Sequence, residues 1–139
     1  MPKVMNFIVS EQSFEKFGMM VILGTTGAAM ETKMNFFFTF WGINLLKKNF
    51  KPKVAGMPFP MKGMAAMMFK KKLKSFGYED MWEMVKDGIE EGNIKLYPCS
   101  MTMDLMGVKK EQIHKFCEEP IGAAKFIEMA DEADKVISL

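Results

Sequence analysis

The sequence predicts an α/β fold, specifically a three-layer α/β/α sandwich with a mostly parallel sheet of four to five strands. Short apolar runs that suit buried strands alternate along the 139 residues with longer segments of helical periodicity, a pattern typical of parallel sheets. Hydrophobic residues make up 49% of the chain, which is enough to bury a substantial core. Because no linker or internal repeat interrupts the pattern, we expect a single domain over residues 1–139.

The N-terminal part predicts a strand, a helix and a second strand. Residues 4–9 form a compact apolar run, and apolar side chains then recur at helical spacing over 14–28. Glycine and alanine at 24–29 allow this helix to lie close against a sheet. Residues 34–40 are almost continuously apolar, as in a strand covered on both faces, and a short helix is expected over 43–48. Two strands around such a helix indicate a right-handed βαβ unit.

The segment from 50 to 76 differs in composition from the rest of the chain. It contains prolines, then a methionine-rich stretch over 57–68, then a lysine run. Pro58 and Pro60 favour a loop before a helix over about 62–75. The methionines suit packing against the domain or a subunit interface, or alternatively a lid over a reactive site; copper binding by thioethers is a further alternative.

The C-terminal part continues the alternation. A helix is expected over 79–91, followed by a strand over 94–98 that leads into Cys99. Further helices are expected over about 109–118 and from about residue 120, with a final strand near 135–138. These elements complete the predicted sandwich.

Composition excludes several classes of function. All 19 basic residues are lysine and the net charge is only +2, so we expect no nucleic-acid partner. Lysine clusters at 47–53 and 70–74 suit solvated faces or, alternatively, a patch for an anionic partner. No apolar run approaches the roughly 20 residues of a membrane span, and the N-terminus resembles no signal peptide. A cytoplasmic protein with no membrane partner is therefore expected.

Cysteine and histidine are too few for a recognised metal site. Cys99 and Cys117 lack CxxC spacing, and His114 is the single histidine, so we expect neither a bound metal nor a cofactor. A helix over 109–117 would carry Cys117 roughly 12 Å along the axis, whereas a disulfide needs Cα atoms within about 7 Å. We therefore expect Cys117 to pack in the core rather than to resolve a disulfide with Cys99, and we expect His114 to be a surface or packing residue.

Cys99 stands where the predicted strand ends and a helix begins. Strand ends at the carboxyl edge of a parallel sheet form the binding crevice, and a helix N-terminus favours a thiolate, so we predict an activated nucleophile. A small buried hydrophobe is the alternative. Ser100 or Thr102 is expected to cap the helix, with N–H groups of residues 101–103 facing the sulfur. A carboxylate near a thiol raises its pKa, so Asp104 is expected instead to stabilise the helix N-terminus or to take part in a proton or partner contact.

Four stretches, taken together, resemble the DsrE/DsrF/DsrH family of sulfur-relay proteins, in particular its DsrE2-like branch, which is often labelled peroxiredoxin-like. These are residues 28–30, 37–43, 99–107 and 132–137. The resemblance spans nearly the whole chain. It implies a single DsrE-like domain of three layers, assembled as a homo-oligomer, in which the catalytic cysteine corresponds to Cys99 and carries sulfur as a persulfide.

The resemblance implies a sulfur carrier or sulfurtransferase that accepts sulfane sulfur on Cys99 and passes it to an acceptor thiol. A small TusA-like carrier protein is the partner that it implies. The alternatives are a thiol-dependent peroxide reductase, or a noncatalytic oligomeric module that binds a ligand or partner in the same crevice. The expected crevice residues lie at the ends of two neighbouring strands: Trp41, Gly42, Ser100, Met101, Thr102 and Asp104.

Overall fold

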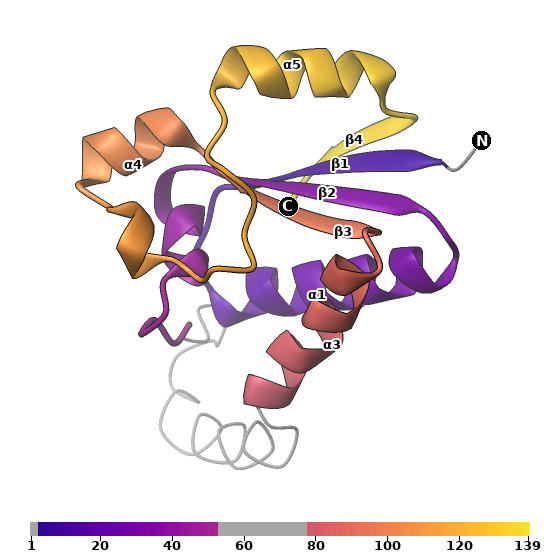
Figure 1. The fold of residues 1–139 in the computed structure, drawn as a ribbon, viewed down its shortest axis with the longest axis horizontal. Helices are drawn as coiled ribbons and strands as arrows, with labels where there is room; N and C mark the ends of the chain where they lie inside the picture. The colour runs from indigo at the N-terminus through magenta and orange to yellow at the C-terminus, as the bar shows by residue number, and fades with distance from the viewer. Residues whose placement is uncertain (1–2, 53–77) are drawn as a thin grey trace, which may run out of the picture.

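A four-stranded parallel sheet forms the centre of the protein (Figure 1). The computed structural model describes residues 3–52 and 78–139. The strands lie in the order β3-β2-β1-β4, and each neighbouring pair is parallel. Their bounds are β1 (Val4–Val9), β2 (Lys33–Phe38), β3 (Ile94–Pro98) and β4 (Lys135–Ser138). The predicted α/β sandwich and its parallel sheet are confirmed.

Helices cover both faces of this sheet. In Figure 1, α1 and α3 lie on one face and α5 on the other, while α4 follows the carboxyl end of β3. Two short 3₁₀ helices connect these elements. The bounds are α1 (Phe14–Ala29), η1 (Phe40–Leu46, 3₁₀), α3 (Tyr78–Glu90), α4 (Ser100–Met106), η2 (Lys110–Gln112, 3₁₀) and α5 (Ala123–Glu132).

Alternation of side chains along the strands divides the core into two parts. Phe7 of β1 and Phe36 of β2 stack at 4.7 Å between ring centroids within the cluster that α1 and α3 cover. Phe37, the next residue of β2, faces the opposite way and stacks on Phe126 of α5 at 4.6 Å. The sheet therefore carries one aromatic stack on each face, the first within the sheet and the second with α5.

The predicted close approach of α1 to the sheet is confirmed. Gly24 and Gly27 are buried, and a Cβ atom at Gly27 would lie only 2.3 Å from Sδ of Met34 on β2. A larger residue at Gly27 would therefore displace the methionine or the helix. At the far end of α3, Gly92 has a φ of 81°, a left-handed conformation that suits the helix stop.

The predicted helix over 109–118 is wrong. Only η2 is helical there. The chain then runs beside β3, and several of its N–H groups donate to other elements of the fold rather than within a helix of their own. His114 N–H donates to Leu46 O at 2.9 Å, and Glu118 N–H donates to Leu96 O at 2.8 Å. Ile121 N–H donates to Pro98 O at 3.0 Å, so the segment reaches the carboxyl end of β3 only there.

Strand β2 ends two residues earlier than predicted. Phe40 has a φ of 47°, which takes the chain out of the extended conformation and starts η1, three residues before the short helix that the sequence predicts. The methionine-rich segment over 57–68 and the lysine run at 70–74 lie outside the described residues. Within residues 3–52 and 78–139, no helix has the length and apolar character needed to cross a bilayer.

Candidate functional site

Cys99 lies at the junction that the sequence predicts, between the end of β3 and the start of α4. Its N–H donates to Phe38 O of β2 at 2.9 Å, and its carbonyl accepts from Met103 N–H at 3.0 Å in the first turn of α4. The parallel bridge to Ile121 fixes it on the other side. Only 6% of the residue is exposed. The backbone of Cys99 is therefore held from three directions, with the side chain just below the surface.

The pKa of the Cys99 thiol lies below its ordinary value. Burial is the largest influence and raises the pKa, because it disfavours the charged thiolate. Polar groups near the sulfur act in the opposite direction: the side chain and the backbone N–H of Thr102, the side chain of Thr39, and the backbone N–H of Met101. Together they outweigh burial, so the structure favours the nucleophilic form of the sulfur.

Thr102 is the central polar residue of this site, and it does not cap α4 as predicted. Its hydroxyl accepts a hydrogen bond from Phe40 N–H at 3.1 Å and lies 3.0 Å from the hydroxyl of Thr39. No side chain caps α4, whose N-cap residue is Cys99 itself. Because Thr102 is 97% buried, its hydroxyl forms its hydrogen bonds with protein groups. It connects the end of β2 to the sulfur.

Thr39 was missed by sequence reasoning. It directly follows β2, and its N–H donates to Val9 O at the end of β1 at 3.0 Å, while its hydroxyl lies 3.0 Å from that of Thr102 on α4. A signal was available, since Thr39 is the only hydroxyl residue at the end of an aromatic run, and the neighbouring strand of a parallel sheet ends at the same edge.

The remaining predicted crevice residues fall into different environments. Ser100 is half-buried and its N–H donates to Ile121 O at 2.9 Å. Asp104 is exposed and lies beyond the first turn of α4, which contains no acidic residue. The influences on the Cys99 pKa include no carboxylate. Gly42 is buried, and a Cβ there would lie 2.1 Å from Val9 O, so its place is in the packing beneath the site.

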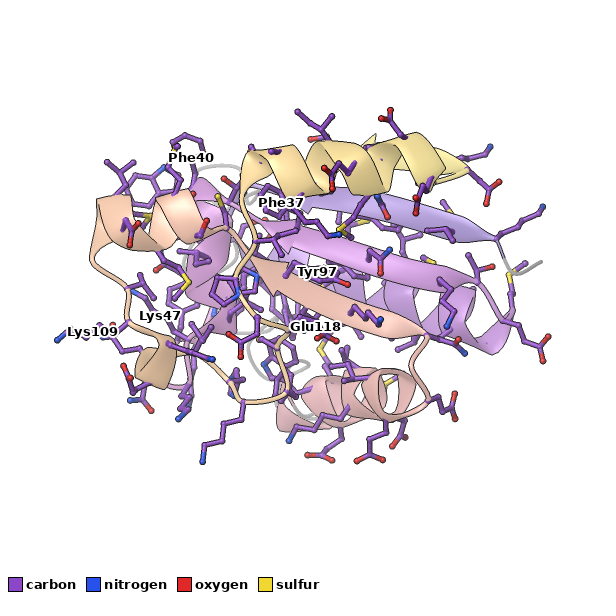
Figure 2. All side chains as sticks on the ribbon, turned by 45° about the horizontal axis from the view of Figure 1, so that its top comes forward. Phe37, Phe40, Lys47, Tyr97, Lys109 and Glu118 are labelled. Carbon is purple, nitrogen blue, oxygen red and sulfur yellow. The ribbon has the colours of Figure 1, made fainter. Side chains whose placement is uncertain are left out.

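Large apolar side chains are exposed on η1 and α4, the two elements that follow the ends of β2 and β3. Trp41 is 61% exposed and Met101 74% exposed, although both are apolar residues that usually avoid water. Phe40 and Leu105 are exposed next to them, and Figure 2 shows Phe40 beside α4. We call Phe40, Trp41, Met101 and Leu105 the apolar rim. Exposed apolar residues on neighbouring elements are typical of a surface that contacts another molecule.

Cys117 lies on the other side of the sheet. It packs against the cluster under α1 and α3, whereas Cys99 packs with Phe37 and Phe126. Both cysteines are free thiols. Cys117 directly precedes Glu118, whose N–H donates to Leu96 O. Leu96 is three residues before Cys99, which corresponds to roughly 10 Å along the strand. The two cysteines are thus separated by the sheet, not by the helix that the sequence predicted.

The two thiols also differ in acidity. Burial, followed by the negative charge of Glu118, raises the pKa of Cys117 to about 12. At neutral pH, Cys117 is therefore a protonated packing residue, whereas the thiol of Cys99 ionises at a lower pH. Among the described residues, no group of three or more histidine, cysteine or acidic side chains is placed to hold a metal ion.

Comparison with known proteins gives the family. The model of the DsrE/DsrF/DrsH-like family matches residues 2–137. The chain belongs to this family. It is 34% identical over 134 residues to the sulfur carrier protein DsrE2 of Allochromatium vinosum, covering 81% of this chain and 83% of that protein. It is also 29% identical over 112 residues to the uncharacterised protein YrkE of Bacillus subtilis, covering 66% and 69%.

Solved structures support the fold. The YchN protein of E. coli superimposes with a TM-score of 0.65 at 14% identity, covering both chains completely. Protein MTH1491 of Methanobacterium thermoautotrophicum, whose function is unknown, gives a TM-score of 0.61 at 8% identity and covers 98% of this chain and 99% of its own. At these identities, the likeness concerns the DsrE-like fold alone.

Proposed function

We propose that this protein is a sulfur carrier that holds sulfane sulfur as a persulfide on Cys99. The observation that carries the proposal is the position of the nearly buried Cys99 at the start of α4, where hydroxyl and backbone N–H groups of residues 39, 101 and 102 lower the pKa of its thiol. Membership of the DsrE/DsrF/DrsH-like family and similarity to a protein named as a sulfur carrier support a role in sulfur relay. A thiolate is the form of cysteine that attacks sulfur, so this environment suits the chemistry.

The proposed transfer takes two displacement steps without any external oxidant. The Cys99 thiolate attacks the outer sulfur of a donor persulfide, R–S–SH; the new bond joins Sγ to that sulfur, and the donor leaves as the thiolate R–S⁻. An acceptor thiolate then attacks the outer sulfur of Cys99–S–SH, takes it as a persulfide, and releases the Cys99 thiolate. Each step exchanges one sulfur–sulfur bond for another, so electrons balance.

Loading with a persulfide donor tests the proposal. The reduced protein is incubated with excess glutathione persulfide, desalted, and analysed by intact and peptide mass spectrometry. We expect one added sulfur atom on the Cys99 peptide, in wild type and in Cys117→Ser, and none in Cys99→Ser. Cys117 stays unmodified because its thiolate fraction at pH 8 is only about one in 10⁴. Absence of a sulfur adduct at Cys99, under conditions that load a known carrier, contradicts the proposal.

The same site can be tested for peroxide chemistry. A peroxide reductase forms a sulfenic acid on Cys99 and turns over continuously with peroxide and thiol, whereas a carrier does not need either reaction. Sustained peroxide consumption by wild type, absent in Cys99→Ser and unaccompanied by persulfide loading, favours the reductase. If wild type shows neither reaction and Cys99→Ala still binds its ligand, the result favours a noncatalytic module.

We propose that the apolar rim docks the protein partner, and that this partner is a small carrier of the TusA-like kind. Cys99 is nearly buried, so a partner sulfur reaches it only by close contact with its surroundings. Those surroundings expose Trp41 and Met101, and a protein that covers them removes two large apolar side chains from water.

Substitutions in the apolar rim separate docking from chemistry. We expect Trp41→Ser and Met101→Ser to slow sulfur transfer to a TusA-like protein by about tenfold, equivalent to 1.4 kcal/mol, with unchanged discharge to a small thiol such as dithiothreitol. Ile127→Ser on α5 is the matched control, because Ile127 is 62% exposed but lies away from the apolar rim. Equal slowing with both acceptors would assign the rim to the chemistry rather than to partner docking.

A further inference from the structure

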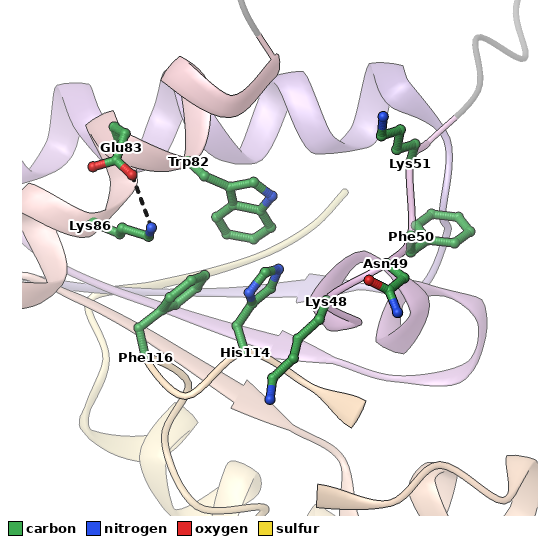
Figure 3. A pocket seen from close by; sticks show the side chains of 9 residues that line it. All are labelled: Lys48, Asn49, Phe50, Lys51, Trp82, Glu83, Lys86, His114 and Phe116. Atoms are coloured by element: carbon green, nitrogen blue, oxygen red, sulfur yellow. Dashed lines mark hydrogen bonds and ion pairs between the residues drawn. The ribbon is translucent and has the colours of Figure 1, made fainter. Parts of the chain in front are cut away.

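A cavity lies apart from Cys99, between α3, the chain after η1, and the segment that follows η2. It has a volume of about 430 Å³, within the range of small-molecule sites. Its walls combine aromatic and cationic side chains (Figure 3). The nine lining residues are Lys48, Asn49, Phe50, Lys51, Trp82, Glu83, Lys86, His114 and Phe116. We call this the lysine pocket.

Three aromatic rings form one wall of the lysine pocket. His114 stacks on Phe116 with centroids 4.7 Å apart and planes at 14°, and Trp82 meets both rings at angles above 50°. The wall is held by the core, since Trp82 also packs on Phe17 of α1 at 5.0 Å. His114 and Phe116 themselves are half-buried. Such a rigid aromatic surface suits a planar ring.

Positive charge surrounds this wall. Lys86 forms an ion pair with Glu83 at 2.9 Å and lies 5.5 Å from the centre of the Phe116 ring. Lys48 and Lys51 have no carboxylate within ion-pair distance in the part of the chain that the structure describes. With three lysines and one glutamate, the lining therefore carries two positive charges in excess.

The charge of the lysine pocket affects the pKa of His114. Burial lowers its pKa most, and the positive charges of Lys86 and Lys48 lower it further. Both ammonium groups thus act on the same point of the wall, and Figure 3 shows Lys48 beside His114 with Lys86 on the side of Phe116. The imidazole is neutral at pH 7, so it stacks without adding a third excess charge.

We propose that the lysine pocket binds a phosphate monoester attached to a planar aromatic ring. The ring packs against His114 and Phe116, and the phosphate lies near His114, where the charges of Lys48 and Lys86 both act. A phosphate monoester carries about −1.5 to −2 charges at pH 7, which matches the excess of two in the lining. Lysine binds phosphate as a point charge, so no arginine is required.

This site is independent of the proposed sulfur chemistry. None of the residues that line the lysine pocket contacts the Cys99 sulfur, whose partners belong to β2 and α4. Trp82 belongs to the cluster under α1 and α3, while Cys99 belongs to the cluster under α5. Binding is therefore expected to be the same in Cys99→Ser, and this variant is used for the test.

The single histidine of the chain gives a specific signal for binding. Adenosine 5′-monophosphate and 1-naphthyl phosphate are titrated into ¹⁵N-labelled full-length protein, and the imidazole correlations of His114 are followed by NMR. We expect saturable shifts with a Kd below about 1 mM for at least one of the two probes. The bound anion should also raise the pKa of His114, because it offsets the charges of Lys86 and Lys48.

Charge-neutral variants locate the phosphate. Lys48→Gln and Lys86→Gln are each expected to weaken binding by about tenfold. In the free protein, each substitution should raise the pKa of His114, because it removes a positive charge that lowers this pKa. The small change would also verify that the variant is folded with His114 in its native environment. Lys125→Gln makes the same charge change on the exposed surface of α5 and should alter neither quantity.

Four results would overturn the proposal. The first is no saturable shift with either probe up to about 1 mM. The second is inorganic phosphate binding as tightly as the ring-bearing probes, which would mean an anion site only. The third is adenosine binding as tightly as its monophosphate, which would mean that the lysines contribute nothing. The fourth is an equal loss of affinity in Lys125→Gln, which would mean a nonspecific charge effect.

Discussion

The ionisation of Cys99 depends on hydrogen bonds from two elements that are distant in the sequence. Two donors are backbone N–H groups at the start of α4, and two are the hydroxyls of Thr39 and Thr102. Thr102 also accepts from Phe40 N–H, so its removal disturbs the backbone, whereas the Thr39 hydroxyl has only the Thr102 hydroxyl as a further partner in this network. Thr39 is therefore the residue through which the thiol can be tested most cleanly.

Thr39→Val is expected to raise the pKa of Cys99, because the sulfur loses a hydrogen bond that favours the thiolate. The thiolate fraction at neutral pH then falls, so alkylation by iodoacetamide at pH 7 should slow by about two- to tenfold. The measurement is the rate of alkylation against pH, whose midpoint should move to higher pH.

Thr39→Ser is the matched control for this substitution. It keeps the hydroxyl and should retain a midpoint close to that of wild type. Equal midpoints in the two variants would show that the Thr39 hydroxyl does not lower the pKa of Cys99. Equally slower alkylation of the valine variant at all pH values would mean that the accessibility of the thiol, rather than its acidity, has changed.

At the scale of single residues, the sequence predicted the position of Cys99 but not the polar side chains around it. Cys99 was placed correctly at the end of a strand, because an apolar run followed by helix-forming residues is a local pattern. Thr39 was missed because its contact with Thr102 joins positions 63 apart in the sequence. The roles of Thr102 and Asp104 at the helix N-terminus were misjudged, because the chain turns so that Cys99 itself occupies the N-cap.

At the scale of elements, η1 brings the end of β2 to the site. It begins at Phe40, whose φ of 47° costs of the order of 1–3 kcal/mol in a residue other than glycine. This turn directs Phe40 N–H to Thr102 and leaves the Phe40 and Trp41 side chains exposed. Gly42 then lies directly against the end of β1, which holds the turn in place.

Gly42→Ala is expected to destabilise the protein by about 1–3 kcal/mol, because the new Cβ would lie 2.1 Å from Val9 O, a backbone atom that cannot rotate away. Gly18→Ala is the control. Its Cβ meets nothing within 4 Å and lies inside α1, so a gain of about 0.5–1 kcal/mol is expected. Urea denaturation measures both. If Gly42→Ala left the free energy of unfolding unchanged, η1 would be able to move away from β1 without loss of stability.

Most elements were predictable because their apolar periods are local. The runs that became β1 and β3, and the helical spacing that became α1 and α3, were all read correctly. The segment over 109–118 was not, because Ile113, Phe116 and Cys117 have helical spacing yet pack from an irregular chain. Its backbone instead bonds to Leu46 of η1 and Leu96 of β3, partners that are distant in the sequence and are supplied only by the folded chain.

At the scale of the whole molecule, one edge of the sheet is open. In the described part of the chain, β4 pairs only with β1, and its side chains are exposed along its whole length, including the apolar residues Val136 and Ile137. An unpaired strand edge with apolar side chains favours association with another chain. The homo-oligomer that the family resemblance implies remains a prediction, and β4 is where we expect contact.

Sedimentation velocity tests this prediction. Wild type is expected to sediment as an oligomer, and Val136→Lys should weaken association by about tenfold or more, because it places a charge in an apolar contact. Ala124→Lys puts the same charge on the exposed side of α5 and should leave the assembly unchanged. A monomeric wild type excludes the oligomer, and equal effects of both lysines exclude β4 as its interface.

The position of the two cysteines on opposite faces of the sheet determines how long a sulfur atom would stay on the protein. A persulfide on Cys99 is lost when another thiol attacks its inner sulfur, since a disulfide then forms and hydrosulfide leaves. Cys117 is the only other thiol of the chain, and the strands stand between it and Cys99. If Cys99 carries sulfur as proposed, the sheet would keep Cys117 from removing it, and the sulfur would stay on the protein until a thiol of another molecule attacks.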